Sequence, residues 1–373
     1  MEVDSMTQRE RQILRWIEEN PLISQQELAD KAGITRSSAA VHISNLMKKG
    51  YIAGKGYIVR SAPYVVVIGG VNMDIGGRSH SPLIFRDSNP GTVRMSLGGV
   101  GRNIAHNMRL LGADVHLVTA FGDDLSAQRL TASCGELGID ISHSLQIPGA
   151  ATSTYLFLSG PDGDMELAVS DMGIYDHLTP TYLGSCLPFL NNAQLIVIDT
   201  NIPRESIEFL VENCRVPIFV DPVSTIKAEK LSSVLGKIHT LKPNRLEAEV
   251  LSGIPLTSRN NIERAADVLL AGGLKRIFIS LGADGVFAAD HKDRSFIPTL
   301  PGKPVNTIGC GDAFMAAIAW AWLEGTNLEN TARAGLAAAS IAIESEETIN
   351  PGLCAGEVLK RSAASTAKFT YPR

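Results

Sequence analysis

Cysteine is scarce in this 373-residue chain, and its placement excludes two common kinds of protein. The five cysteines are odd in number and scattered, without the paired spacing of a zinc site or the dense framework of a small secreted domain. Long apolar runs are also absent: none reaches the ~18 residues that a membrane-spanning helix needs, and the first ten residues are polar. We therefore expect a cytoplasmic protein with no membrane contact.

Charge of one sign does not dominate the chain, but it is unevenly placed. Residues 1–60, here called the head, carry nine Lys and Arg against seven Asp and Glu, whereas the net charge of the whole chain is −5. The head is therefore weakly positive and the remainder, here called the body, is negative. With 45% hydrophobic residues, the chain has enough apolar surface for two or three domains.

The head has the pattern of a winged helix-turn-helix. Helical spacing and capping residues predict helices over 7–19, 25–32 and 35–50, and residues 51–60 alternate around a Gly-Lys-Gly turn as a hairpin does. In the third helix, five residues are expected to face inward: Ala39, Ala40, Ile43, Leu46 and Met47.

The third helix is also the candidate DNA-reading element. It contains basic residues and no acid, so its exposed face suits phosphates and base edges. The candidate DNA-binding residues are Arg36, Ser37, Ser38 and His42. The alternative is a small accessory module for dimerisation, because a charge of +2 is a weak electrostatic signal.

From residue 64 onward the pattern becomes that of an α/β protein. Continuous apolar runs at 64–68, 115–119, 195–199, 217–221 and 276–280 predict buried parallel strands, because helical stretches lie between them. Two segments, about 76–97 and 151–171, instead predict antiparallel strands that project as a lid. The domain boundaries expected are 1–60 for the head and 64–373 for the body.

The segment 306–314 carries the clearest chemistry. Gly309, Cys310 and Gly311 precede an apolar helix, so their backbone N–H groups and the helix dipole form a candidate anion hole for a transferred phosphate. Asp312 would then accept the proton of an attacking hydroxyl. Taken alone, the same residues are equally well explained as a tight turn with an acidic cap.

Other segments are open to two interpretations each. Asp74 with Asn72 follows the first strand and suits ribose hydroxyls, but an isolated Asp there is also a common cap. Gly98, Gly99 and Asn103 do not fit a dinucleotide fingerprint and suit close packing against a sugar.

The candidate nucleotide residues are equally ambiguous. Asn244 and Glu247 suit phosphates and Mg²⁺-bound water, or form an N-cap pair. Ser280 and Gly282 admit a nucleotide or form a hairpin turn.

In this order, the segments resemble the ribokinase-like (PfkB) carbohydrate and nucleoside kinases from residue 64 to about 359. The runs 87–91, 98–105 and 239–249 are most similar to pseudouridine kinases. The resemblance implies a mostly parallel central sheet flanked by helices with a small β lid, and transfer of the ATP γ-phosphate to the 5′-hydroxyl of a nucleoside, pseudouridine first.

The resemblance also implies residue roles. Ribose or base would be bound by Asn72, Asp74, Gly98, Gly99, Asn103, Ser153, Tyr155 and Asn201. Mg-ATP would be bound by Asn244, Ser280 and Gly282, with Glu247 acting on Mg²⁺ through water. Kinases for inosine, adenosine or ribose, and a nucleoside-sensing transcription regulator, are the alternatives; the intact Asp312 turn argues against the last.

Two departures from the family pattern lie in the catalytic turn. Residue 306 is Asn where the family usually has Asp, and residue 310 is Cys where it usually has Ala. Many relatives place a monovalent cation beside this turn, and a neutral amide attracts K⁺ less than a carboxylate does, so the K⁺ requirement stays open. Because winged helices bind paired half-sites, a homodimer is expected, formed through either the head or the lid.

Overall fold

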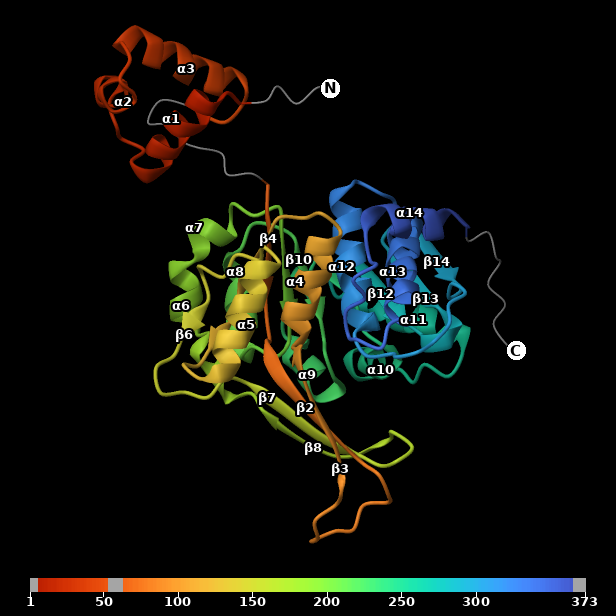
Figure 1. Ribbon diagram of the computed structural model, residues 1–373. Helices are drawn as coiled ribbons and strands as arrows, with labels where there is room; N and C mark the ends of the chain where they lie inside the picture. Colours follow the sequence, from red (N-terminus) through yellow and green to blue (C-terminus); the bar gives the residue numbers. More distant parts are fainter. Residues whose placement is uncertain (1–5, 53–62, 365–373) are drawn as a thin grey trace. The chain divides into compact units, whose positions relative to one another are not determined.

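The computed structural model describes residues 6–52 and 63–364 (Figure 1). Two compact units divide the chain, residues 1–63 and residues 64–373. Among the described residues, no helix combines the length and the apolar character needed to cross a bilayer.

Three short helices build the head around a small apolar core. They are α1 (Gln8–Glu19), α2 (Gln25–Ala32) and α3 (Arg36–Lys48). Ser24 begins α2 with a complete capping box and Gly33 ends it in the left-handed conformation, as predicted. Thr7 begins α1 with a second capping box, which was not predicted. The core is formed by Ile13, Ile17, Leu28, Ile43, Leu46 and neighbouring side chains.

One inward residue of α3 was predicted wrongly. Met47 is 43% exposed, whereas Leu46 is fully buried. The two side chains are about 100° apart around the helix axis, so only one of them can point at the core centre. Of the predicted hairpin over 51–60, residues 53–60 lie outside the described part of the chain.

An eight-stranded sheet forms the centre of the body, in the order β14-β13-β12-β11-β10-β9-β1-β4. The six strands from β4 to β12 in this order pair in parallel, and β13 and β14 continue the sheet antiparallel. The bounds are β1 (Val65–Ile68), β4 (Val115–Val118), β9 (Leu195–Asp199), β10 (Ile218–Asp221), β11 (Thr240–Leu241), β12 (Arg276–Ser280), β13 (Val286–Asp290) and β14 (Arg294–Ile297).

Helices cover both faces of this sheet because its strands are apolar on both sides. In β9, Ile196 and Ile198 pack into one core with α6, α7, α8, α10 and α11, while Leu195 and Val197 pack into a second core with α4, α12, α13 and α14. The helix bounds are α4 (Val100–Leu110), α5 (Leu125–Glu136), α6 (Pro180–Ser185), α7 (Leu187–Leu190), α8 (Arg204–Asn213), α9 (Thr225–Ala228), α10 (Arg245–Ser252), α11 (Arg259–Ala271), α12 (Cys310–Leu323), α13 (Leu328–Ala342) and α14 (Ala355–Ala364). The body is therefore a three-layer α/β fold, as predicted.

A second sheet of four strands projects from the body as a lid (Figure 1). Its order is β3 (Gly91–Gly98), β2 (Asn72–Ser79), β7 (Thr154–Ser159) and β8 (Met165–Asp171). The outer pairs are antiparallel, and β2 and β7 join them in parallel. A further short pair, β5 (Ala120–Phe121) and β6 (Leu145–Gln146), lies outside both sheets.

Candidate active site

The turn before α12 has the conformation that an anion site requires. Gly309 is the N-cap at φ +82°, and a β-carbon there would overlap the backbone oxygen of Thr348. Among the described residues, no side chain caps this helix. The N–H of Cys310 makes one long contact, 3.5 Å, to the backbone oxygen of Thr307. The N–H groups of this first turn lie at the positive end of the helix dipole.

Asp312 lies in the first turn of α12 and is held by a residue of another helix. Asn103, in the first turn of α4, donates from Nδ2 to Oδ2 of Asp312 at 2.8 Å, and both side chains are buried. Burial, together with the nearby Asp221 carboxylate, raises the pKa of Asp312 to about 8, and the hydrogen bond from Asn103 and the Lys242 ammonium oppose this shift. The structure thus joins two predicted site residues that are far apart in sequence.

Lys242 supplies a buried positive charge beside the same turn. Its Nζ lies 3.1 Å from Oδ2 of Asp221 and 3.4 Å from the position that a β-carbon on Gly311 would occupy. Burial alone would lower the pKa of Lys242, but the carboxylates of Asp221 and Glu247 outweigh it and raise the pKa. Lys242 is therefore a charged ammonium placed against the candidate anion hole.

Two buried aspartates that the sequence reasoning missed complete this edge of the sheet. Asp199 and Asp221 are the last residues of β9 and β10 and are register partners. Asp199 accepts from the N–H of Gly70 at 2.7 Å and from that of Asn201 at 2.8 Å. A signal was available, because each closes an apolar strand, and parallel sheets bind ligands beyond these ends.

The candidate ribose residues meet at the start of β2, the lid strand that follows β1 of the main sheet. Asn72 donates from Nδ2 to Oδ1 of Asp74, and the carboxylate of Asp74 occupies the space that a side chain at Gly98 would need. Burial raises the pKa of Asp74 to about 6, against the opposing effect of the Asn72 hydrogen bond. Gly99, at φ +98°, lies so close to the backbone of Gly70 that a β-carbon would clash.

Three further predicted residues adjoin this group from β7 and from the segments next to β7 and β9. The backbone oxygen of Ser153 accepts from the N–H of Met73 at 3.0 Å, and Tyr155 is the β7 register partner of Asp74. The Asn201 side chain lies against Gly70 and accepts at Oδ1 from Nζ of Lys227. Lys227 is a second lysine that the sequence reasoning did not identify.

The candidate nucleotide residues occupy the start of α10 and the end of β12. Asn244 caps α10: its Oδ1 accepts from the N–H of Glu247 at 2.9 Å, while Glu247 Oε2 accepts from the N–H of Asn244 at 2.8 Å. This is the capping alternative considered for the pair. The backbones of Asn244 and Ser280 pair in an isolated parallel β-bridge. Gly282, at φ +63°, has open space where a side chain would be.

The fit of Mg²⁺ can be judged from these donors. Among the described residues, no group of three or more His, Cys, Asp or Glu side chains is arranged to hold a metal ion. Mg²⁺ commonly binds through substrate phosphates with one or two carboxylates and several waters, which does not need such a group. Glu247, buried and bonded within its capping box, suits contact through water rather than direct coordination.

In the head, the four candidate DNA-binding residues share the first two turns of α3. Arg36, Ser37 and Ser38 are exposed, and both serine hydroxyls lie 2.9 Å from Oγ1 of the cap Thr35. His42 is half-buried, and its Nδ1 has no hydrogen-bond partner among the described residues.

Comparisons with known proteins agree with this geometry. Residues 62–353 match the pfkB family of carbohydrate kinases, and residues 6–53 match the winged helix-turn-helix DNA-binding family. Pseudouridine kinase of Escherichia coli (strain K12) is 40% identical over 303 residues, which cover 81% of this chain and 97% of that protein. The uncharacterized sugar kinase YeiI of the same organism is 38% identical over 356 residues, covering 95% of this chain and 98% of that protein.

Solved structures lead to the same family. A Clostridium perfringens protein provisionally assigned as a sugar kinase superposes with a TM-score of 0.73 at 31% identity, covering 82% of this chain and 96% of that one. Arabidopsis thaliana ribokinase, solved with ribose and ATP, shares the fold with a TM-score of 0.72 at 24% identity, covering 82% and 100%. The chain therefore belongs to the pfkB family of carbohydrate kinases: its body has the ribokinase fold and follows, in the sequence, an N-terminal winged helix-turn-helix.

Proposed function

We propose that this kinase transfers the γ-phosphoryl group of ATP to the ribose 5′-hydroxyl of pseudouridine, with Asp312 as the general base. The observation that carries the proposal is the contact between Asp312 and Asn103. It brings the candidate anion hole before α12 next to the first turn of α4, which contains the candidate sugar-binding residue Asn103. The identity to the E. coli pseudouridine kinase supports this choice of nucleoside.

Each group in the site has a part in the proposed reaction. Asp74, with Asn72 and Asn103, holds the ribose, so that its 5′-oxygen faces Asp312. This oxygen forms the new bond to phosphorus, the bond from phosphorus to the ADP oxygen breaks, and the hydroxyl proton passes to Asp312. The N–H groups of residues 309–311 and the Lys242 ammonium stabilise the charge on the phosphoryl group.

ATP and Mg²⁺ would be held on the neighbouring edge of the sheet. In the proposed arrangement, Asn244, Ser280 and Gly282 line the nucleotide side, and Glu247 acts through water on an Mg²⁺ ion carried by the phosphates. Mg²⁺ supplies positive charge to the phosphates when bound.

A substrate panel tests the choice of nucleoside. Initial rates of ADP formation would be measured with pseudouridine, uridine, inosine, adenosine and ribose at matched concentrations. Uridine is the matched control, because it differs from pseudouridine only in the atom through which the base joins the sugar. We expect pseudouridine to have the highest kcat/KM. Faster turnover of inosine or ribose would contradict the choice of pseudouridine and identify that compound as the preferred substrate.

For the head, we propose DNA binding through α3, supported by the winged helix-turn-helix match. The kinase would then also act as a nucleoside-responsive regulator. Retention on duplex DNA at low salt, lost on deletion of residues 1–60 while kinase activity remains, is the expected result. Arg36→Ala should weaken retention, whereas Arg9→Ala, which removes the same charge from α1, should not; equal effects would favour the accessory-module alternative.

A further inference from the structure

The segment between α13 and α14 is bonded directly to the catalytic turn. The N–H groups of Val305 and Asn306 donate to the backbone oxygen of Ile343, at 2.7 and 3.2 Å. Gly309 is packed against the backbone oxygen of Thr348, as described above. Residues 343–348 therefore contact the turn that precedes Asp312 at two places, beside residues 305–306 and beside Gly309.

Asn306 is the side chain that joins these two segments. Its Nδ2 donates to the backbone oxygen of Glu346 at 3.1 Å, and its Oδ1 accepts from the N–H of Ile308 at 3.0 Å. The opposite orientation of the amide would set nitrogen against an N–H group and oxygen against a carbonyl, so the hydrogen bonds fix the assignment. Both ends of the amide are therefore used inside the protein.

This arrangement does not fit the monovalent cation that the family resemblance implies beside the turn. Cations are bound by oxygen atoms, and here an N–H group points at the Glu346 carbonyl. A carboxylate at 306 would instead place an oxygen opposite that carbonyl oxygen, which is repulsive unless a cation lies nearby.

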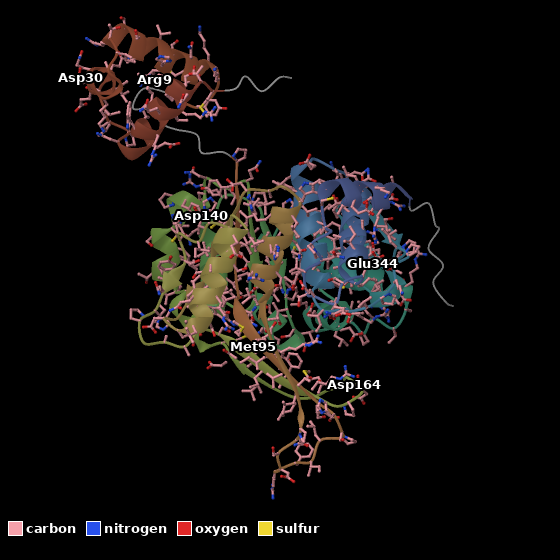
Figure 2. The ribbon with its side chains drawn as sticks, viewed as in Figure 1. Arg9, Asp30, Met95, Asp140, Asp164 and Glu344 are labelled. Atoms are coloured by element: carbon pink, nitrogen blue, oxygen red, sulfur yellow. The ribbon has the colours of Figure 1, made fainter. Side chains whose placement is uncertain are left out.

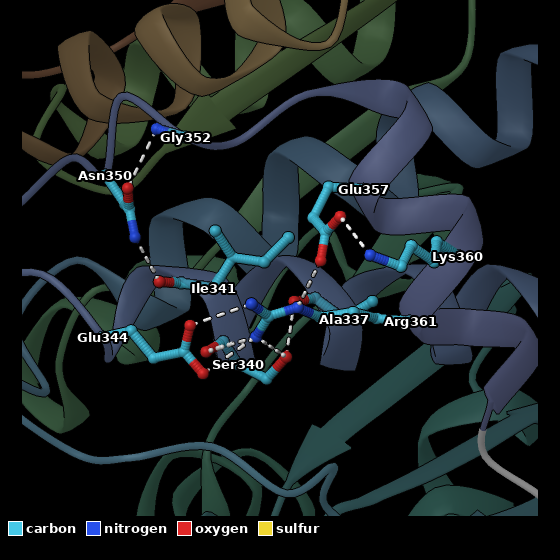
Figure 3. A network of polar contacts seen from close by, with 9 residues as sticks. All are labelled: Ala337, Ser340, Ile341, Glu344, Asn350, Gly352, Glu357, Lys360 and Arg361. Carbon is cyan, nitrogen blue, oxygen red and sulfur yellow. Dashed lines mark hydrogen bonds and ion pairs between the residues drawn. The ribbon is translucent and has the colours of Figure 1, made fainter.

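One carboxylate of this segment, Glu344, is paired with a cation of α14. Arg361 of α14 donates to Glu344 at 2.8 Å and to Glu357 at 3.1 Å, and it contacts the backbone oxygen of Ser340 (Figure 3). Hydrogen bonding from Arg361 lowers the pKa of Glu344. This carboxylate is thus already neutralised by a guanidinium.

We propose that the Asn306 amide replaces the monovalent cation, so that this kinase needs no K⁺. The amide fastens residues 343–348 to the turn without an ion. Exchange of its nitrogen for oxygen, Asn306→Asp, would remove the fastening and create a cation requirement. The proposal rests on the kinase activity proposed above, but its thermal-stability consequences do not.

The test compares the wild type with Asn306→Asp and Asn306→Ala, at fixed ionic strength in tetramethylammonium or potassium chloride. Melting temperature is measured without substrates, and initial rate with pseudouridine and Mg-ATP. For the wild type we expect both quantities to be the same in the two salts. For Asn306→Asp we expect a rate about tenfold lower without K⁺, largely restored by K⁺, and a melting temperature raised by K⁺ by roughly 2 °C or more.

Asn306→Ala separates loss of the amide from gain of a cation site. It should be slower and less stable than the wild type in both salts, because it provides neither the amide nor a carboxylate. Stimulation or stabilisation of the wild type by K⁺ and not by tetramethylammonium would overturn the proposal, even if Asn306→Asp fails to fold. So would an Asn306→Asp protein that is as fast as the wild type without K⁺. If no nucleoside is phosphorylated but the melting pattern holds, the proposed substrate fails and the inference about Asn306 stands.

Discussion

Asp74 and Asp312, two carboxylates of the candidate active site, have pKa values that are raised for the same reason and to different extents. Both are shielded from water, which disfavours the charged form, but Asp312 also has the Asp221 carboxylate nearby and has a pKa of about 8, against about 6 for Asp74. At neutral pH, Asp74 is mainly ionised and suited to accept hydrogen bonds from sugar hydroxyls. Asp312 is mainly protonated in the free protein and becomes an effective base only as the pH rises.

The pH dependence of kcat/KM follows from this shift. The active form has ionised Asp312, so kcat/KM should increase about tenfold per pH unit below pH 8 and level off above it. Asn103→Ala removes a hydrogen bond that lowers the pKa, so the rising limb should move to higher pH. Steady-state rates from pH 6 to 9.5, with recovery of activity after return to pH 8 as the stability control, provide the measurement. A flat profile would show that Asp312 does not titrate as the base.

At the scale of elements, the sequence predicted local patterns such as helix caps, but it did not predict which distant residues meet in the folded protein. The capping box of α2 was recognised because Ser24 and Glu27 lie three residues apart. Asp199, Asp221 and Lys242 were missed because their proximity depends on the pairing of β9, β10 and β11, which no single segment reveals. For Asn244 and Glu247, the capping geometry present in α10 and a role toward Mg-ATP give the same spacing, so sequence could not separate them.

The turn before α12 predicts a contrast between two glycines. Gly309→Ala should lower the free energy of unfolding by about 1–3 kcal/mol, because it strains a φ of +82° and overlaps Thr348. Gly325→Ala, at φ +74° with open space around it, is the matched control and should cost less. Gly311→Ala should fold normally but lose turnover, since its methyl group would project beside Lys242 into the anion site. Urea unfolding measures the free energies of unfolding of the variants, and initial rates measure the turnover of Gly311→Ala. Equal stability losses at 309 and 325 would contradict the packing argument.

At the scale of the whole molecule, the lid has one polar and one apolar face. Asp74 and Tyr155 share the polar face. By strand register, the apolar lid face consists of Val93, Met95, Leu156, Leu167 and Val169, each at least 38% exposed. Figure 2 labels Met95 on this sheet and Asp164 in the turn between β7 and β8. An exposed apolar face of this kind is typical of an interaction surface.

We expect a second copy of the chain to cover the apolar lid face. A two-fold axis sets such a face against itself, and its lack of charge avoids like-charge repulsion. Light scattering should therefore give a dimer for the wild type and a monomer for Val93→Glu with Val169→Glu. Arg78→Glu, on the opposite face of the lid, is the control and should stay dimeric. A dimer that survives the double substitution but is lost on deletion of residues 1–60 would place the contact in the head.

The most direct test of the kinase proposal is the steady-state turnover of Asp312→Asn with pseudouridine and Mg-ATP. Asn keeps the shape of the side chain and removes the base, and it introduces no new buried charge, so folding should be unaffected. We expect kcat to fall by about 10²-fold or more, while the nucleoside dissociation constant, measured by calorimetry, stays close to that of the wild type. Turnover near the wild-type rate would contradict the assignment of Asp312 as the base.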